Sequence, residues 1–325
     1  MDARGIDHEA WQQHAWLNRL QSLALLVFMG GFLAALGWLL WGGVGVVVLL
    51  VFGIVGVFMN PSLSPTWVMR MYGASRLGQG QAPGLTAALA ALAQRAGLPS
   101  MPDLYYVPSR MLNAFAVGHP ARSAIAVTDG LLNQLEDREL LGVLAHEMSH
   151  IHNNDLWVMG LADMFSRATS FLSLFGQLLL IVNLPLVMTG YAAINWLAIA
   201  LLIFAPNLSA LAQLALSRTR EYDADLNAAR LTGDPEGLAS ALAKIERVQG
   251  GWLERILLPG RRVPEPSLLR THPRTEDRIR RLADLRRRDQ AIGLLADETR
   301  ARSGTVAPGQ RELRAPRWHV NGLWH

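Results

Sequence analysis

Two histidines and a glutamate between positions 146 and 150 have the residue types and spacing of a catalytic metal site. The sequence there is His146-Glu147-Met148-Ser149-His150, so the histidines are four positions apart. On a helix this spacing places both imidazoles on one face, where they can bind one tetrahedral zinc ion. Zinc lowers the pKa of a bound water toward 7, and a neighbouring carboxylate can accept its proton. The pattern therefore predicts zinc-dependent hydrolysis with Glu147 as the general base.

Catalytic zinc needs a third protein ligand from another part of the chain. Glu221 is the candidate, and Asp225 follows it one helical turn later on the same face. Asp225 is then placed to accept the distal N–H of a ligating histidine, which fixes the tautomer of that histidine. On residue chemistry alone, four other donors compete with Glu221: Asp155, Asp225, His152 and His272.

The element that carries the two histidines is predicted to be an amphipathic helix. Asp137 is a suitable N-cap for it. Apolar residues at helical spacing define its buried face: Leu140, Leu141, Leu144, Met148 and Ile151. The histidines lie on its other side.

Charged residues are distributed very unevenly along the chain. Of 325 residues, 51% are hydrophobic and 17% are charged, whereas soluble domains have about 25% charged residues. Two windows, 20–69 and 168–217, contain no charged residue, and the remainder carries all 30 basic and 26 acidic side chains. A wholly soluble protein and a wholly membranous one are therefore both excluded. The chain has no cysteine, which excludes disulfides, cysteine-ligated metals and thiol catalysis.

Each uncharged window is long enough for two membrane-crossing helices of about 20 residues. The sequence predicts four spans in two hairpins: 22–41, 44–59, 171–189 and 192–205. We expect the last span to end before Pro206. For the second window, an interfacial or partly covered hairpin is the alternative. Positive charges flank both windows and are missing from both connecting turns, which places the polar parts on the cytoplasmic side.

Three short segments before the histidine helix have the alternation of β-strands: 104–107, 113–117 and 123–127. They predict a small sheet that packs on the catalytic helices. The segment 113–117 is the candidate edge strand that would hold an extended substrate by main-chain hydrogen bonds. His119 lies just beyond this strand and is interpreted as a loop residue rather than a ligand.

The order of these motifs resembles that of the HtpX-like family of membrane zinc metalloproteases, which are related to the CAAX prenyl-peptidases. The resemblance covers approximately residues 22–285. The matching motifs are Asn113-Ala114-Phe115-Ala116, Asp129-Gly130-Leu131-Leu132, the His146 to His150 motif with Asp155, Ser217-Arg218 through Glu221 to Asp225, and Thr271-His272-Pro273 with Arg278.

This resemblance implies a role for each matching residue. Glu221 becomes the third zinc ligand, beside His146 and His150, with Glu147 as base and Asp225 as the partner of a ligating histidine. His272 is implied as a catalytic group that stabilises the oxyanion, and Arg278 as a clamp on the substrate backbone. An ion pair that locks the C-terminal helix is the alternative for Arg278. Residues implied to bind substrate on the edge strand are Asn113, Ala114, Phe115 and Ala116.

The expected fold is an α-helical membrane protein with a zincin-like α+β catalytic domain, a small sheet and about four transmembrane helices. The expected organisation is an amphipathic N-terminal segment (1–21), a transmembrane hairpin (22–60), the first half of the protease domain (70–167), a second hydrophobic hairpin (168–217), the second half of the protease domain (218–288) and a flexible tail (289–325).

The expected function is that of a zinc endopeptidase with one Zn²⁺ per subunit, in the bacterial plasma membrane. The resemblance implies a stress-response role in the proteolysis of damaged or misfolded membrane proteins. Its partners would be protein or peptide substrates and the lipid bilayer, with no nucleic acid. A specific processing peptidase, or a non-catalytic membrane scaffold that retains a zinc site, is the alternative. The sequence leaves the substrate and the oligomeric state open.

Overall fold

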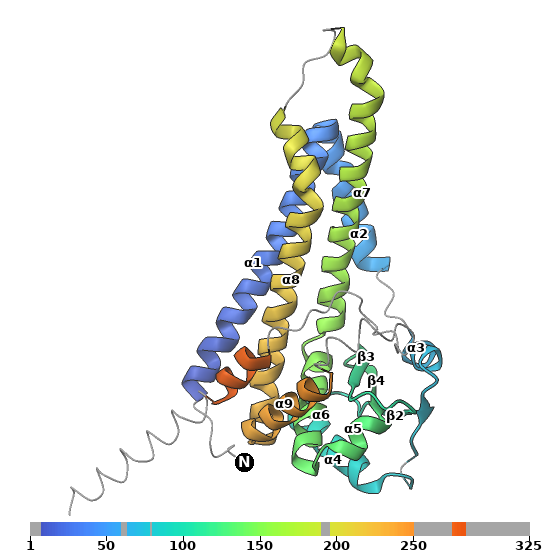
Figure 1. Ribbon diagram of the computed structural model, residues 1–325, viewed down its shortest axis with the longest axis vertical. Coiled ribbons are helices and arrows are strands. Elements are labelled where there is room, and N and C mark those ends of the chain that lie inside the picture. The colour runs from blue at the N-terminus through green and yellow to red at the C-terminus, as the bar shows by residue number, and fades with distance from the viewer. Residues whose placement is uncertain (1–7, 60–63, 79, 190–195, 250–274, 284–325) are drawn as a thin grey trace, which may run out of the picture. The chain divides into compact units, whose positions relative to one another are not determined.

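The computed structural model describes residues 8–59, 64–78, 80–189, 196–249 and 275–283. These residues are mostly helical and include a small four-stranded sheet (Figure 1). By length and composition, three helical segments are suited to cross a membrane: Trp11–Trp41, Asp155–Leu186 and Ala198–Thr232. The expected mostly helical membrane fold is confirmed to this extent. The fourth span and the zincin-like detail of the catalytic domain stay predictions.

The first hairpin consists of α1 (His8–Trp41) and α2 (Gly43–Met59), joined at Gly42. Gly42 has a φ of 61°, a conformation that glycine adopts without steric cost. The helices approach closely where a Cβ added to Gly45 would lie 2.0 Å from the carbonyl oxygen of Gly37. α1 is continuous across the expected boundary between residues 21 and 22. α2 has 17 residues, slightly fewer than the about 20 of a typical span.

The second hairpin consists of α7 (Asp155–Met188) and α8 (Trp196–Thr232). The expectation that its last span ends before Pro206 is wrong, because α8 continues through Pro206 for another 26 residues. Pro206 leaves the carbonyl of Leu202, four positions earlier, without its helical donor. The hydroxyl of Ser173 on α7 donates to that carbonyl. This side-chain donor lets the helix pass the proline without an unsatisfied group.

α1, α7 and α8 pack against one another along the apolar part of the molecule (Figure 1). Two clusters of buried side chains fill the space between them. One contains Leu33, Leu36, Leu172, Leu202 and Ala205, and the other contains Met29, Ala162, Ala212 and Leu216. The three candidate membrane helices are therefore held together by side-chain packing.

The sheet confirms the three expected strands, with bounds shifted by one or two residues. Its strands are β1 (Ser75–Arg76), β2 (Asp103–Val107), β3 (Ala114–His119) and β4 (Arg122–Thr128). Their order is β1-β2-β4-β3, with β2 parallel and β3 antiparallel to β4. β3 is the last strand of the sheet on its side, as expected for the candidate edge strand. His119 is the final residue of β3, paired with Arg122, and not a loop residue.

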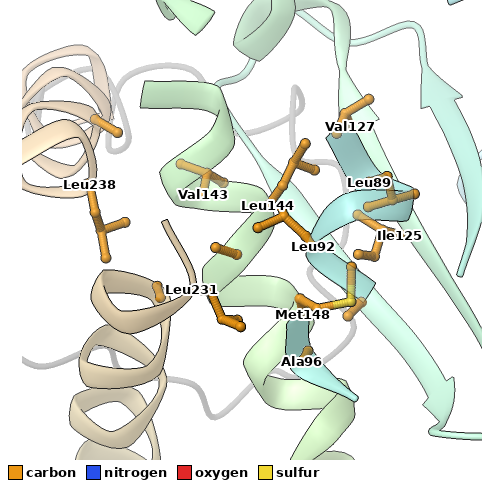
Figure 2. Close-up of a cluster of buried hydrophobic side chains, with 14 of the residues drawn as sticks. Leu89, Leu92, Ala96, Ile125, Val127, Val143, Leu144, Met148, Leu231 and Leu238 are labelled. Carbon is orange, nitrogen blue, oxygen red and sulfur yellow. The ribbon is translucent and has the colours of Figure 1, made fainter. Parts of the chain in front are cut away.

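One face of the sheet packs against α6 (Asp137–His152), which carries the two histidines of the motif. α4 (Pro83–Ala96) and α9 (Pro235–Gln249) pack on α6, and α5 (Asp129–Gln134) contacts β4. The core between them combines Leu89 and Leu92 of α4 with Ile125 of β4 and Leu144 and Met148 of α6 (Figure 2). The other face is covered by α3 (Pro65–Met71), which contacts β3 and β4.

The N-terminus of α6 differs by one residue from the expectation. Glu136, not Asp137, is the N-cap, and it forms a capping box with Glu139. In this box, Glu139 accepts a hydrogen bond from the backbone N–H of Glu136 at 2.9 Å. Leu144, Met148 and Ile151 of the expected apolar face are fully buried. The helix therefore presents the face opposite its histidines to the core, as its sequence predicts.

Candidate active site

α6 places the two histidines of the motif side by side in the interior. The side chains of His146 and His150 are one helical turn apart, and both residues are buried. Their Nε2 atoms are 3.1 Å apart. Glu147 lies between them in sequence and is 9% exposed, so it retains some access to solvent.

Glu221 of α8 completes a group of three donors with these histidines. Its Oε2 is 3.4 Å from Nε2 of His146, and its Oε1 is 3.6 Å from Nε2 of His150. Ligands of a tetrahedral zinc ion with bonds of about 2.0 to 2.1 Å are separated by about 3.3 Å. Two imidazoles and a carboxylate at 3.1 to 3.6 Å from one another therefore fit one zinc ion.

Behind His146, a carboxylate and a guanidinium form a chain of hydrogen bonds. Oδ1 of Asp225 is 3.0 Å from Nδ1 of His146. Arg278 donates two hydrogen bonds to Asp225, from Nε at 2.7 Å and from Nη2 at 2.6 Å. When a metal is bound, this contact would keep the proton of His146 on Nδ1 and leave the lone pair of Nε2 for the metal. Asp225 thus lies at hydrogen-bond distance from His146, as its expected role requires.

A second chain of the same kind stands behind His150. Oδ2 of Asp155 is 2.7 Å from Nδ1 of His150. Arg220 holds the other oxygen of Asp155, from Nε at 2.6 Å and from Nη2 at 2.5 Å. All three residues are buried. Each histidine of the motif is therefore oriented by an aspartate that is fixed by an arginine.

The turn between α6 and α7 brings Asp155 back to His150. It contains only Asn153 and Asn154, and Asn154 has a φ of 55°. Asparagine is one of the few residues other than glycine that tolerate this conformation. Asp155 is the first residue of α7. The start of a candidate membrane helix is thus part of the environment of His150.

The buried carboxylates control the charge of His146. Burial by itself lowers the pKa of the imidazole, but hydrogen bonds with Asp225 and Glu221 outweigh burial and raise the pKa to about 9. Burial also lowers the pKa of Arg278, and the charges of Asp225 and Glu221 reverse this effect and raise it. A cation that enters the site competes with the proton on His146 for the same negative environment.

Among the candidate donors that the structure describes, Glu221 contacts the Nε2 atoms of both histidines. Asp155 and Asp225 contact the distal Nδ1 atoms of the histidines. His152 is exposed at the end of α6. The fourth competitor, His272, lies outside the described residues, and so does its implied role at the oxyanion. The tail 289–325 also lies outside them.

Arg278 is 5% exposed and pairs with Asp225, and its Nη1 is 3.4 Å from Oε2 of Glu221. This contact matches the alternative in which Arg278 locks the C-terminal helix, residues 275–283, onto α8.

The substrate segment lies at the edge of the sheet, where Phe115 and Ala116 are buried and Ala114 is half-buried. Asn113 precedes β3, and its backbone N–H donates to Oγ1 of Thr128 at 3.0 Å.

Sequence reasoning did not find the role of Asp155 or the contribution of Arg220. Asp155 was one of several acids near the motif, and the two-residue turn that brings it to His150 leaves no periodic signal. Arg220 directly precedes Glu221 and resembled a residue flanking a membrane helix. The sequence does contain one signal for Arg220. It stands beside the candidate ligand Glu221 in a segment that must be buried, and an unpaired buried charge is costly.

Long apolar helices that lead directly into a buried donor set of two histidines and one glutamate define a membrane metalloprotease. The chain belongs to peptidase family M48, whose model matches residues 80–286. The first hairpin lies before the matched region, whereas the second hairpin lies within it.

Several proteins named protease HtpX homolog are similar to the chain. The one from Desulfatibacillum aliphaticivorans is 35% identical over 295 residues, which are 83% of this chain and 90% of that protein. The one from Aquifex aeolicus is 38% identical over 275 residues, which are 79% of this chain and 90% of that protein. The crystal structure of S. mikatae Ste24p matches with a TM-score of 0.46 and 20% identity, over 82% of this chain and 66% of that chain.

Proposed function

We propose that the chain is a zinc-dependent endopeptidase that cleaves damaged or misfolded membrane proteins at the cytoplasmic face of a bacterial plasma membrane. The observation that carries the zinc dependence is the set of three donors at 3.1 to 3.6 Å, with the distal nitrogen of each histidine held by a carboxylate. Imidazole and carboxylate donors in this number suit catalytic zinc, which keeps one position open for water.

The proposed ligands are His146, His150 and Glu221. Zinc at this place would polarise the carbonyl of the scissile bond and lower the pKa of a water molecule toward 7. Glu147 would accept the proton of that water and pass it to the leaving amine. Asp225 and Asp155 would keep a proton on Nδ1 of each histidine, so that both Nε2 lone pairs remain available.

The edge of β3 is the proposed site of substrate binding. A substrate segment in extended form can pair with the free edge of β3 through main-chain hydrogen bonds. Such pairing depends little on side chains, which suits a protease that removes many different damaged proteins. Arg278 would support this site by holding Asp225, and His272 remains the proposed group for the oxyanion.

The test compares the wild type with Glu147→Gln, purified in detergent and supplied with zinc. An unfolded casein-like chain is the substrate, and bound zinc is measured for both proteins. We expect the Glu147→Gln variant to keep its zinc and to lose about 10²- to 10⁴-fold in turnover, because the proton acceptor is gone. Equal cleavage by both proteins, or no cleavage by zinc-loaded wild type, would contradict the proposal.

Substrate class is tested separately by mapping cleavage products with mass spectrometry. Wild-type and Glu147→Gln proteins are each expressed in cells whose membrane proteins have been damaged by heat. The proposed role predicts many cleavage sites without a shared sequence, located in cytoplasmic parts of membrane proteins. A single recurrent site would instead favour a specific processing peptidase.

A further inference from the structure

The short helix α3 has one buried face and one exposed apolar face. Val68 is 6% exposed and Met69 is fully buried, whereas Trp67 is 55% and Met71 is 65% exposed. Arg70 is exposed as well. Trp67, Arg70 and Met71 are spaced at i, i+3 and i+4, so they lie on one side of the helix. Two large apolar groups therefore point outward around one positive charge.

The buried face of α3 belongs to the packing of the candidate substrate strand. Val68 and Met69 share a cluster with Phe115 and Val117 of β3. Next to α3, the ring of Tyr72 lies 4.8 Å from that of Phe115. α3 contacts β3 and β4 in the folded chain (Figure 1). A surface that holds α3 in place therefore also holds the edge strand in place.

The chain keeps α3 close to a membrane. α3 begins at Pro65 and α2 ends at Met59, and the residues between them span no more than about 20 Å even when extended. β3 contacts α7 as well, and Trp157 in the first turns of α7 is 38% exposed. The outer face of α3 is thus a short distance from lipid on the side where the apolar helices end.

The composition of this region suits lipid headgroups. No acidic residue occurs between Glu9 and Asp103, and Arg70 lies within this stretch. Tryptophan is enriched at membrane interfaces, where an apolar ring meets a polar environment. Arginine near an anionic membrane surface is attracted to the lipid headgroups. An amphipathic helix with such a face lies in the plane of the interface.

We infer that the outer face of α3, formed by Trp67, Arg70 and Met71, lies in the headgroup region of the bilayer that holds the hairpins. This contact fixes the edge of β3 at the membrane surface. Polypeptide that emerges from the bilayer then reaches the edge strand before polypeptide free in solution does. The contact itself is independent of the proposed protease function, whereas this consequence for substrates depends on it.

The contact is tested with single cysteines, because the natural chain has none. A fluorophore is attached to Met71→Cys, to Gln94→Cys at an exposed position of α4, or to Phe171→Cys at an exposed position of α7. Each protein is placed in vesicles of phosphatidylcholine and phosphatidylglycerol. Quenchers are nitroxide lipids labelled near the headgroup and aqueous iodide. The expected result is that lipid quenches position 71 about twofold more strongly than position 94, as at an interfacial site. Position 171 is the reference for lipid exposure.

Two outcomes would overturn the inference. Position 71 could be quenched by iodide as strongly as position 94 and not by lipid, which would place α3 in water. It could also be shielded from both quenchers, which would mean that a protein, such as a second copy of the chain, covers α3. Vesicles of phosphatidylcholine alone test the contribution of Arg70, and weaker lipid quenching there is expected.

The preference for membrane-attached substrates is tested with two single variants, Trp67→Glu and Met71→Glu. Gln94→Glu is the control. Each protein is given one peptide in two forms, free in solution and attached to a membrane helix in the same vesicles. We expect KM for the attached form to rise about tenfold, with kcat for the free form unchanged, because acidic residues leave the interface. Equal losses on both forms would contradict the substrate consequence. If wild type cleaves neither form, the proposed function fails, and lipid quenching alone decides the contact.

Discussion

At the scale of single residues, each histidine of the motif contacts an aspartate that is held by an arginine. The sequence indicates the three candidate donors and Asp225, but not the roles of Asp155 and Arg220. The spacing of His146 and His150 is a local property of a helix. A returning hairpin made Glu221 one of five candidate third donors, and the family resemblance singled it out. Asp155 and Arg220 depend on the path of a two-residue turn and on a pairing between two helices. No periodicity in the sequence encodes either contact.

Arg220→Gln is expected to weaken zinc binding by about 10- to 100-fold, the usual effect of losing a partner behind a metal ligand. Arg220 fixes Asp155, which in turn fixes His150. The measurement is competition for zinc with a chelating dye, together with circular dichroism to follow helix content. Arg167→Gln is the control, because Arg167 is an exposed arginine on α7.

Because a lone buried Asp155 could itself disturb folding, a second variant is needed. Asp155→Asn combined with Arg220→Gln removes both charges and is expected to keep the fold. Zinc affinity of this double variant should equal that of Asp155→Asn alone, because Arg220 acts through Asp155. Additive losses, or unchanged zinc affinity in Arg220→Gln, would show that Arg220 does not position His150.

At the scale of elements, the hairpins and strands follow from composition and alternation, whereas their ends do not. Pro206 predicted a helix end, and Ser173 on the neighbouring helix removes the reason for it by donating to Leu202. The N-cap of α6 is Glu136, one residue before the expected Asp137, because Glu136 and Glu139 form a capping box. In both places a side chain from outside the local pattern satisfies the backbone.

The contact between α6 and α9 makes stability depend on pH. Glu139 of α6 accepts hydrogen bonds from Ser240 and Lys244 of α9, at 2.5 and 2.7 Å. Burial raises the pKa of Glu139, but Lys244 and Ser240 outweigh burial and lower it below its ordinary 4.5. A lowered pKa stabilises the fold above the unfolded value, and this contribution is lost as the pH falls through the folded value.

Glu139→Gln is therefore expected to lower the free energy of unfolding by about 1 to 3 kcal/mol at pH 7, because a buried ionised acceptor is lost. The difference from the wild type should shrink as the pH falls below the ordinary glutamate pKa of 4.5 and through the lowered pKa of folded Glu139. Thermal unfolding of both proteins in detergent at several pH values measures this difference in stability. Asp137→Asn, at an exposed position of the same turn, serves as the control, and an equal loss in that variant would argue against the contact with α9.

The α1–α2 hairpin depends on the close approach of two glycines. In Gly45→Leu, the new Cβ would lie 2.0 Å from the carbonyl oxygen of Gly37, so the helices must separate. Overpacking of this kind costs about 1 to 3 kcal/mol, and we expect a lower Tm in detergent. Gly53→Ala is the matched control, because a Cβ there meets nothing within 4 Å. A Gly45→Leu protein as stable as the control would contradict this packing.

At the scale of the whole molecule, the expected plan places every polar part on one side of the membrane. The distribution of charges predicts this plan, since both uncharged windows are flanked by arginines. Three candidate spans are seen among the described residues, and α2 must also cross for the plan to hold. With 17 residues, α2 is close to the minimum length of a span.

Cysteine labelling in sealed vesicles tests this membrane topology directly. Gln94→Cys in α4 and Trp41→Cys at the end of α1 are both exposed positions. We expect a membrane-impermeant maleimide to label position 94 only from the cytoplasmic side and position 41 only from the other side. Labelling of positions 41 and 94 from the same side would exclude a crossing by α1. Labelling of position 94 only from the outside would invert the proposed orientation.

α8 joins the lipid-buried part of the molecule to the third proposed ligand in one continuous helix. Glu221 is 25 residues beyond Trp196, or about 37 Å along the axis. A change of about 5° in the tilt of this helix, pivoting at its far end, moves the carboxylate by about 3 Å, comparable to the spacing of the donors. Helices change tilt to match bilayer thickness. Cleavage rates measured in bilayers of short-chain lipids will therefore differ from those in bilayers of long-chain lipids, even when the reacting groups are identical.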